Sequence, residues 1–250
     1  MTTYEKWALA LSIIAILIPF VQWIWKNWMQ RPILQYYPTG KAYLHFNTSG
    51  SYIRIDGVFE AFNKPIAVKK VTVKIHRESD DKNLNLVWST LLSPVNQSIA
   101  GAYTSTQETA HPFRIDADSI MCAFIEFAPM ANSSWRAITP SYDQFTQLCK
   151  TIKKDEMTFD DAIKTVKLSA EYSSVKSALE KEFYWRIGNY KVEIQTYYGK
   201  KNTKSFTYGF SVDEYNLAKL RNNIGELLLA PLKPMYNIPL SMQVAEIELK

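Results

Sequence analysis

The stretch "AVKKVTVKIHR" at residues 67–77 carries the pattern that decides the fold. Apolar residues recur at nearly every second position, with lysine or threonine between them. This two-residue period is typical of a β-strand that buries one face and exposes the other. The apolar positions are Val68, Val71, Val73 and Ile75, and the polar positions are Lys70, Thr72 and Lys74.

Neighbouring stretches also have strand character. Residues 41–46 and 52–62 alternate in the same way, 83–92 forms another strand-like run, and 119–129 is typical of a more deeply buried strand. The turn-forming Asn63-Lys64-Pro65 separates two of these runs. Because the connections are short, antiparallel pairing is favoured over β-α-β units. We therefore expect the first part of an antiparallel β-sandwich over residues 32–130.

The apolar period then changes to that of helices, over residues 140–183. Ser141 and Gln144 follow Pro140 in the order of a capping box, and Thr158 is placed to cap a second helix. The pattern predicts a helical insertion that packs on itself and on the sheet. Its three apolar stripes are Phe145, Leu148 and Ile152; Phe159, Ile163 and Val166; and Tyr172, Val175, Leu179 and Phe183.

Residues 184–250 are expected to complete the sandwich. Two alternating runs, 189–198 and 204–212, flank "GKKNT" and predict a hairpin. A helix capped by Asp213 should follow and end before Pro231. The sequence "LSMQVAEIELK", residues 240–250, predicts a last strand. Its apolar face is expected to be Met242, Val244, Ile247 and Leu249, with one break in phase.

The hairpin "GNYKVEIQTYYGKKNTKSFTYGFSV", residues 188–212, resembles the final hairpin of immunoglobulin-like sandwiches. The resemblance covers about 25 residues and lacks the paired cysteines and tryptophan of antibody domains. It implies that Tyr190 caps a corner at the start of its strand. The expected fold class is therefore α+β, mainly β: an antiparallel, immunoglobulin-like sandwich with a helical insertion.

A membrane helix is expected before this domain. Lys6 and Lys26 bracket 19 uncharged residues, enough for a helix to span about 30 Å of hydrocarbon. We assign residues 1–6 to a short tail and 7–29 to the helix. Tryptophans near both ends match the aromatic belts of membrane proteins, and Pro19 is tolerated in such helices. The residues expected to characterise the anchor are Trp7, Pro19, Gln22, Trp23, Trp25 and Trp28.

The competing interpretation is a cleaved secretory signal, but bulky residues stand where a cleavage site would need small ones. Lys26, Arg31 and Lys41 follow the span without an acid until Asp56. By the positive-inside rule we expect the amino terminus outside and the carboxyl-terminal domain in the cytoplasm. The expected location is the cell membrane, specifically a bacterial inner membrane.

The composition argues against several function classes. The net charge is +5 with 21% charged residues, a surplus too small and too dispersed to predict specific nucleic-acid binding. Cys122 and Cys149 do not suggest a disulfide framework, and Cys122 is expected as inert packing in its strand. Glycine-rich phosphate loops and the G-x-S-x-G motif do not occur. We therefore assign no catalytic residue and no cofactor.

The remaining polar candidates are weak. His111 lies near Glu108, Asp116 and Asp118, but an extended backbone would separate it from the aspartates by about 16 Å, so no metal site is assigned. The pairs Asp80-Asp81 and Asp160-Asp161 fall at a turn and a helix start, where negative charge is ordinary.

A basic hairpin tip is the strongest candidate for surface binding. Lysine beside tyrosine on a protruding turn suits lipid headgroups, a nucleic-acid backbone or an acidic partner, although an ordinary solvated turn has the same composition. The candidate binding residues are Tyr197, Tyr198, Lys200, Lys201 and Lys204.

These features favour a single-pass, membrane-anchored binding or adaptor protein that performs no chemistry. Its expected partners are the bilayer and either another protein or a second copy of the chain. One alternative is a membrane-acting effector of the bacterial defence type, whose soluble domain senses a ligand while its anchors assemble. The other is an enzyme whose active site matches no motif.

Overall fold

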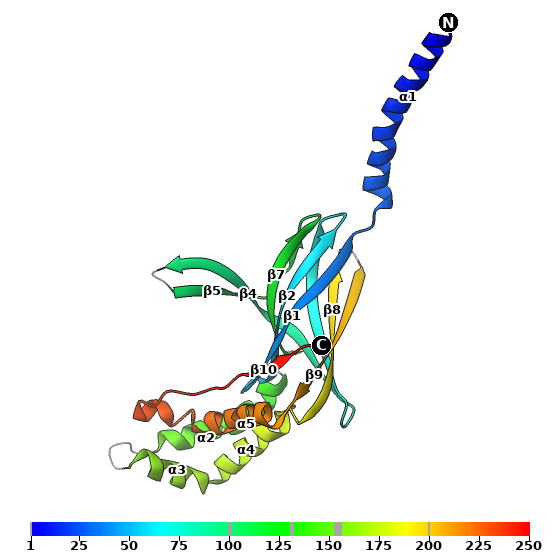
Figure 1. The fold of residues 1–250 in the computed structure, drawn as a ribbon. Coiled ribbons are helices and arrows are strands. Elements are labelled where there is room, and N and C mark those ends of the chain that lie inside the picture. Colours follow the sequence, from blue (N-terminus) through cyan, green and yellow to red (C-terminus); the bar gives the residue numbers. More distant parts are fainter. Residues whose placement is uncertain (1, 100–101, 131–132, 153–156, 200) are drawn as a thin grey trace.

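A computed structural model describes residues 2–99, 102–130, 133–152, 157–199 and 201–250. The chain forms a mainly antiparallel β-sheet with helices, so the expected α+β class is confirmed. An isolated helix, α1 (Thr3–Ile24), precedes the sheet and continues as a π-helical turn, η1 (Trp25–Met29) (Figure 1). Its apolar part, Lys6–Ile24, is long enough to cross a bilayer by length and composition, and none of it is buried.

The described strands all belong to one sheet. It has ten strands, in the order β10-β1-β2-β7-β4-β3-β8-β9, with β5 paired to β4 and β6 paired to β3. The strands are β1 (Ile33–Asn47), β2 (Gly50–Phe62), β3 (Ile66–Arg77), β4 (Lys82–Ile99), β5 (Ala102–Thr109), β6 (Phe113–Ile115), β7 (Ser119–Pro129), β8 (Gly188–Tyr198), β9 (Asn202–Val212) and β10 (Ala245–Glu248).

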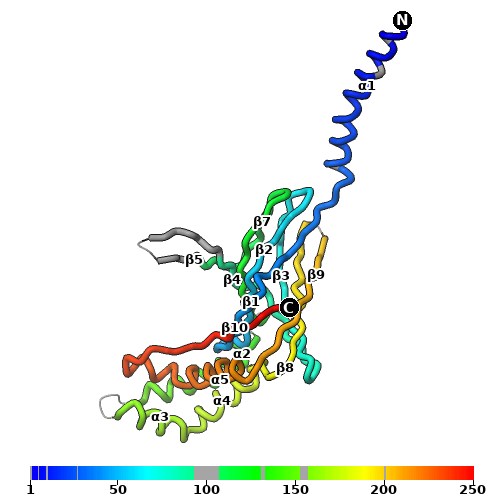
Figure 2. Tube along the Cα trace, viewed as in Figure 1, coloured from blue at the N-terminus to red at the C-terminus, as the bar shows by residue number. Residues whose placement is uncertain are grey.

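This sheet curls into a half-barrel whose two edges approach each other. Main-chain hydrogen bonds join Gly209 of β9 to Lys250, just after β10, at 2.8 and 2.9 Å. The Tyr208 hydroxyl donates to the carbonyl of Tyr36 on β1 at 3.1 Å. Closing a sheet protects edge strands that would otherwise pair with other chains. The tube in Figure 2 shows the first and last strands running side by side.

The expected immunoglobulin-like sandwich is not confirmed, because the described strands follow one hydrogen-bonded path instead of forming two facing sheets. The apolar positions of alternating strands point into the curl and fill it. Val68, Val71, Val73 and Ile75 are all buried there, as the pattern of residues 67–77 predicts. Alternation identifies the buried face of a strand, but it contains no information on how many sheets the strands form.

The helices form a layer at the end of the sheet opposite α1 (Figure 1). They are α2 (Ser133–Lys150), α3 (Phe159–Lys167), α4 (Ala170–Glu182) and α5 (Glu214–Leu229), followed by a short 3₁₀ helix, η4 (Lys233–Tyr236). Their apolar faces make a second core, which contains Phe145, Val175 and Leu227. Phe46 at the end of β1 belongs to this core and packs edge-on against Phe183 at 5.0 Å.

Local signals locate several helix ends correctly. The Thr158 side chain accepts a hydrogen bond from the Asp161 backbone, and Asp213 accepts one from the Asn216 backbone. The predicted start at Ser141 is wrong: α2 begins at Ser133, and Pro140 lies inside it. Proline is usually excluded from helix interiors, which is why the sequence suggested a boundary there.

Two expectations about strands are confirmed only in part. The last strand exists and Ile247 and Leu249 are buried, but it is only Ala245–Glu248, and Met242 and Val244 lie before it with 39% of their surface exposed. In β7, Cys122 is exposed and Ile120 is 66% exposed, so this strand buries one face only.

Candidate functional site

A groove of about 520 Å³ lies between α4 and α5, in the helical layer. Residues spaced by one helical turn form its walls, because they share a face of each helix. Its floor is apolar and contains the buried Trp185 and Leu228. The lining residues are Tyr172, Lys176, Glu180, Phe183, Trp185, Arg186, Arg221, Ile224, Gly225 and Leu228.

Basic side chains outnumber acidic ones around this groove. Lys176, Arg186 and Arg221 line it, whereas Glu180 is its one acidic lining residue among the described residues. Lys176 lies 3.9 Å from Glu180. No ion pair of Arg221 is found within the described part of the chain. An apolar floor with a basic rim suits an apolar partner that carries carboxylates or phosphates.

Gly225 leaves open space in the α5 wall. A Cβ atom added at this position would meet nothing within 4 Å. Glycine inside a helix costs about 1 kcal/mol relative to alanine. Packing within the described chain therefore does not explain this glycine, whereas close approach of a ligand would.

The segment after α4 closes one end of the groove and ties it to the sheet. The Trp185 indole donates to the carbonyl of His45 on β1 at 3.0 Å. The Tyr184 backbone donates to the Ser51 hydroxyl at 3.1 Å. The Tyr184 hydroxyl lies 2.9 Å from the carbonyl of Lys82, its closest acceptor. Contacts with three different parts of the sheet hold this segment in place.

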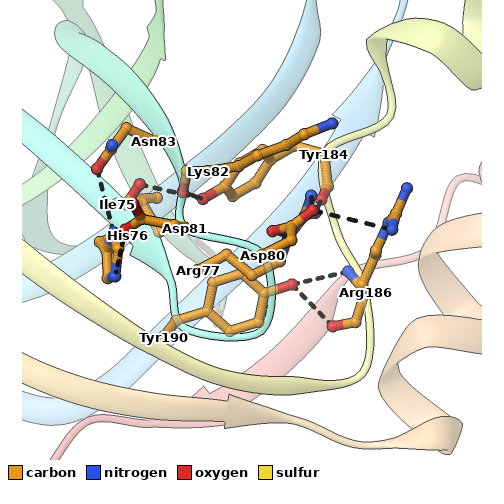
Figure 3. A network of polar contacts seen from close by, with 10 residues as sticks. All are labelled: Ile75, His76, Arg77, Asp80, Asp81, Lys82, Asn83, Tyr184, Arg186 and Tyr190. Carbon is orange, nitrogen blue, oxygen red and sulfur yellow. Dashed lines mark hydrogen bonds and ion pairs between the residues drawn. The ribbon is translucent and has the colours of Figure 1, made fainter.

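Arg77 is the centre of this attachment (Figure 3). It ends β3 and is only 2% exposed. Its guanidinium donates two hydrogen bonds to the Asp80 carboxylate, both 2.7 Å, and a third to the Tyr184 carbonyl. The bonds from Arg77 hold the pKa of Asp80 below its usual value. Asp80 also lies 3.9 Å from Arg186, so the network connects the sheet with the groove.

Tyr190 fixes the turn that leads into β8. Its hydroxyl accepts from the Arg186 backbone N–H and donates to the Arg186 carbonyl, both at 2.7 Å. Its ring stacks on Phe210 with centroids 4.8 Å apart. Burial raises the pKa of the Tyr190 hydroxyl. The corner contact implied by the resemblance is therefore confirmed, and it positions a groove residue.

The structure brings only part of the predicted hairpin tip to the surface. Tyr197 and Tyr198 are half-buried, and the Tyr197 hydroxyl donates to Gln195 at 2.6 Å. Lys204 is also half-buried and donates to Gln35 on β1 at 3.2 Å. Lys201 is exposed, and Lys200 lies outside the described residues.

The predicted anchor residues are all in α1 or η1. The tryptophans are exposed, from 54% for Trp25 to 80% for Trp28. Pro19 lies inside α1, and Gln22 faces outward from it. Trp23 packs on Phe20 with ring centroids 6.3 Å apart.

The other polar candidates do not converge. His111 lies 3.9 Å from Glu108, whereas Asp116 pairs with Arg114 at 3.4 Å. Asp118 accepts a bond from the Asn63 backbone at 2.9 Å.

The two cysteines differ in reactivity. Burial raises the pKa of the Cys149 thiol to about 11. A thiol with such a pKa is inert near neutral pH. Cys122 is exposed instead of packed as predicted.

Sequence reasoning missed a charged cluster on the outer face of the sheet. Arg54 pairs with Asp56 at 3.1 Å and lies over the Tyr43 ring at 4.0 Å. Glu126 stands opposite Arg54 in the β2–β7 register, and burial raises its pKa. The alternation that predicts the buried face also places Arg54 and Asp56 together on the other face, so this signal was present in the sequence.

The groove was missed for a different reason. Its apolar lining residues on the helices, such as Tyr172 and Ile224, recur at the helical spacing of ordinary packing faces, and its charged residues lie between them like those of any exposed helix surface. When the chain is compared with known proteins, no family model and no curated protein sequence matches it.

Proposed function

We propose that this chain is a single-pass, membrane-anchored binding protein that performs no chemistry. In this proposal α1 spans the bilayer, the sheet and helices stand on the cytoplasmic side, and the α4–α5 groove receives a protein partner. The observation that carries the proposal is the basic, apolar-floored groove at the end of the molecule opposite the apolar helix.

The placement of the groove suits an adaptor. β1 contains 15 residues and runs from the anchor towards the helical layer, a path of roughly 45 Å at the usual rise per residue. A partner seated in the groove would therefore stay clear of the headgroups. The basic residues around the groove favour a partner segment with apolar side chains flanked by acidic ones.

Photo-crosslinking in intact membranes tests the proposal. A photoreactive amino acid replaces Lys176 in the otherwise unchanged full chain, and irradiation should give a discrete adduct. Adding Arg221→Glu should abolish this adduct, because the reversed charge repels an acidic segment. Adding Lys167→Glu, on the exposed side of α3, is the matched control and should leave it intact.

Two outcomes would contradict the proposal. One is an adduct that survives Arg221→Glu unchanged. The other is turnover of a nucleotide, peptide or ester by the purified chain, abolished by a point substitution.

The membrane-acting effector remains a second candidate because of Gln22. This polar side chain lies in an apolar helix, and no hydrogen bond of its amide is found within the described part of the chain. In hydrocarbon such an amide is satisfied best by a second helix. An effector would leak dye from vesicles and lose this activity on Gln22→Leu, whereas a passive anchor would leave vesicles intact in both forms.

A further inference from the structure

The end of the sheet next to α1 is a continuous surface, which we call the proximal rim. It comprises the link at Arg31, the β2–β3 turn, the β6–β7 turn and the described residues of the β8–β9 turn, Gly199 and Lys201. The Asn63 backbone donates to Asp118 at 2.9 Å, and the Asn63 amide donates to the Arg31 carbonyl at 3.1 Å. Gly199 donates to the carbonyl of Ala67 at 3.1 Å. These bonds join segments that are far apart in the sequence.

Basic side chains dominate the described part of this rim. A register shift between Val68 and Lys70 in the β3–β8 ladder accompanies the exposure of both Lys69 and Lys70. Such bulges re-aim side chains at the ends of sheets. The acidic residues on the described rim are Glu60, Asp116 and Asp118. The basic residues are Arg31, Lys64, Lys69, Lys70, Arg114 and Lys201.

The rim lies directly against the end of the apolar helix. A hollow of about 580 Å³ is lined on one side by Val21, Trp25 and Lys26 and on the other by Asn63 and Asp118. Tryptophan and lysine at the end of a membrane helix mark the headgroup level. With α1 in a bilayer, the rim would therefore lie at the depth of the headgroups.

We propose that the proximal rim binds anionic lipid headgroups, so that the sheet stands on the leaflet instead of pivoting at the Arg31–Pro32 link. This rests on the proposed function, because α1 must lie in a bilayer. An anionic leaflet attracts basic side chains within about 10 Å of its surface. Each such side chain should raise the ratio of docked to undocked molecules about five-fold. The ligand is the headgroup phosphodiester of an anionic lipid such as phosphatidylglycerol, which keeps its net negative charge, whereas choline neutralises the phosphodiester of phosphatidylcholine.

The experiment measures the distance of the rim from the bilayer in the full chain. Cys122→Ser removes the exposed thiol, Cys149 stays buried, and Thr203→Cys places a donor dye beside the rim. The protein is reconstituted in vesicles that contain a dilute acceptor lipid. Energy transfer should be higher with phosphatidylglycerol than with phosphatidylcholine alone, and the difference should disappear at high salt.

Neutralising three rim lysines tests the residues themselves. Lys69→Gln, Lys70→Gln and Lys201→Gln together should lower the ratio of docked to undocked molecules on the order of a hundred-fold. Energy transfer should then be the same with phosphatidylglycerol as with phosphatidylcholine alone. The matched control neutralises exposed lysines of the helical layer, and it should keep the higher energy transfer with phosphatidylglycerol. Its substitutions are Lys150→Gln, Lys167→Gln and Lys181→Gln.

Failure of this inference is distinguishable from failure of the anchor. A chain that floats with both kinds of vesicle but shows equal energy transfer in them overturns lipid docking alone. Lipid docking is also overturned if the rim variant and its control lose the difference in energy transfer between the two lipids to the same extent. A chain that floats with neither kind of vesicle overturns the membrane anchor, and with it the docking.

Discussion

Individual side chains determine how firmly the groove is attached to the sheet. The burial of Arg77 could be anticipated, because it continues the phase of Val73 and Ile75 along β3. Its contact with the Tyr184 carbonyl could not, because Tyr184 is 107 residues away in sequence. Pattern analysis shows which side chain is buried, whereas its contacts depend on how distant segments meet.

Tyr190→Phe should weaken the corner beside the groove. The substitution removes the hydroxyl that bonds both backbone groups of Arg186, and a hydrogen bond of this kind contributes about 1 kcal/mol to net stability. The free energy of unfolding, measured by denaturant titration in detergent, should fall by this amount. Tyr215→Phe is the control, since Tyr215 is 68% exposed, and it should change little. Equal stability of the Tyr190→Phe chain and the parent would contradict the corner's role.

The Arg77–Asp80 pair should make stability sensitive to acid. Arg77 lowers the pKa of Asp80, so the unfolded chain binds this proton more tightly than the folded chain. The stabilisation is therefore complete above the unfolded pKa of about 3.9 and is lost as the pH falls through the folded pKa.

Melting curves at several pH values check this dependence. Asp80→Asn should melt below the parent near neutral pH, and the two melting temperatures should converge in acid. Asp143→Asn, at an exposed position of α2, should show no such convergence. If the difference in melting temperature between Asp80→Asn and the parent stays constant into acid, the titration of Asp80 does not contribute to stability.

Among the elements, those defined by neighbouring residues were predicted best. The β8–β9 hairpin and the caps at Thr158 and Asp213 depend on a few adjacent positions, and the structure contains all three. The start of α2 was missed because Pro140 is held inside a helix that packs through Ile138 and Phe145. Tertiary packing outweighed the local preference there.

Gly225→Ala should separate stability from binding within α5. Alanine favours a helix interior by about 0.5–1 kcal/mol, and its Cβ would meet nothing within 4 Å. The variant should therefore unfold at higher denaturant concentration while losing the crosslinked partner, because the methyl group occupies the groove. Asn222→Ala, at an exposed position outside the groove lining, should stabilise α5 without affecting the adduct. A full adduct with Gly225→Ala would show that the partner binds elsewhere.

At the scale of the whole molecule, the orientation of the chain can be read from its thiols. Cys122 is exposed and Cys149 is buried with a raised pKa, so one thiol per chain should react. With the domain in the cytoplasm, a membrane-impermeant maleimide should label Cys122 only after the cells are opened. The Cys122→Ser chain should stay unlabelled throughout. Labelling of Cys122 in intact cells would reverse the proposed topology.

The curl of the sheet could not be derived from the sequence, because nothing in the alternation of β1 or β9 indicates which strands become neighbours. This closure has a consequence for biosynthesis. β1 pairs with β10 about 200 residues later, so the half-barrel cannot be completed until Glu248 has left the ribosome. At typical translation rates the apolar helix emerges many seconds earlier. If α1 enters the bilayer as proposed, the nascent chain is tethered there while β1 is still unpaired on one edge, and chaperone protection matters most in that period.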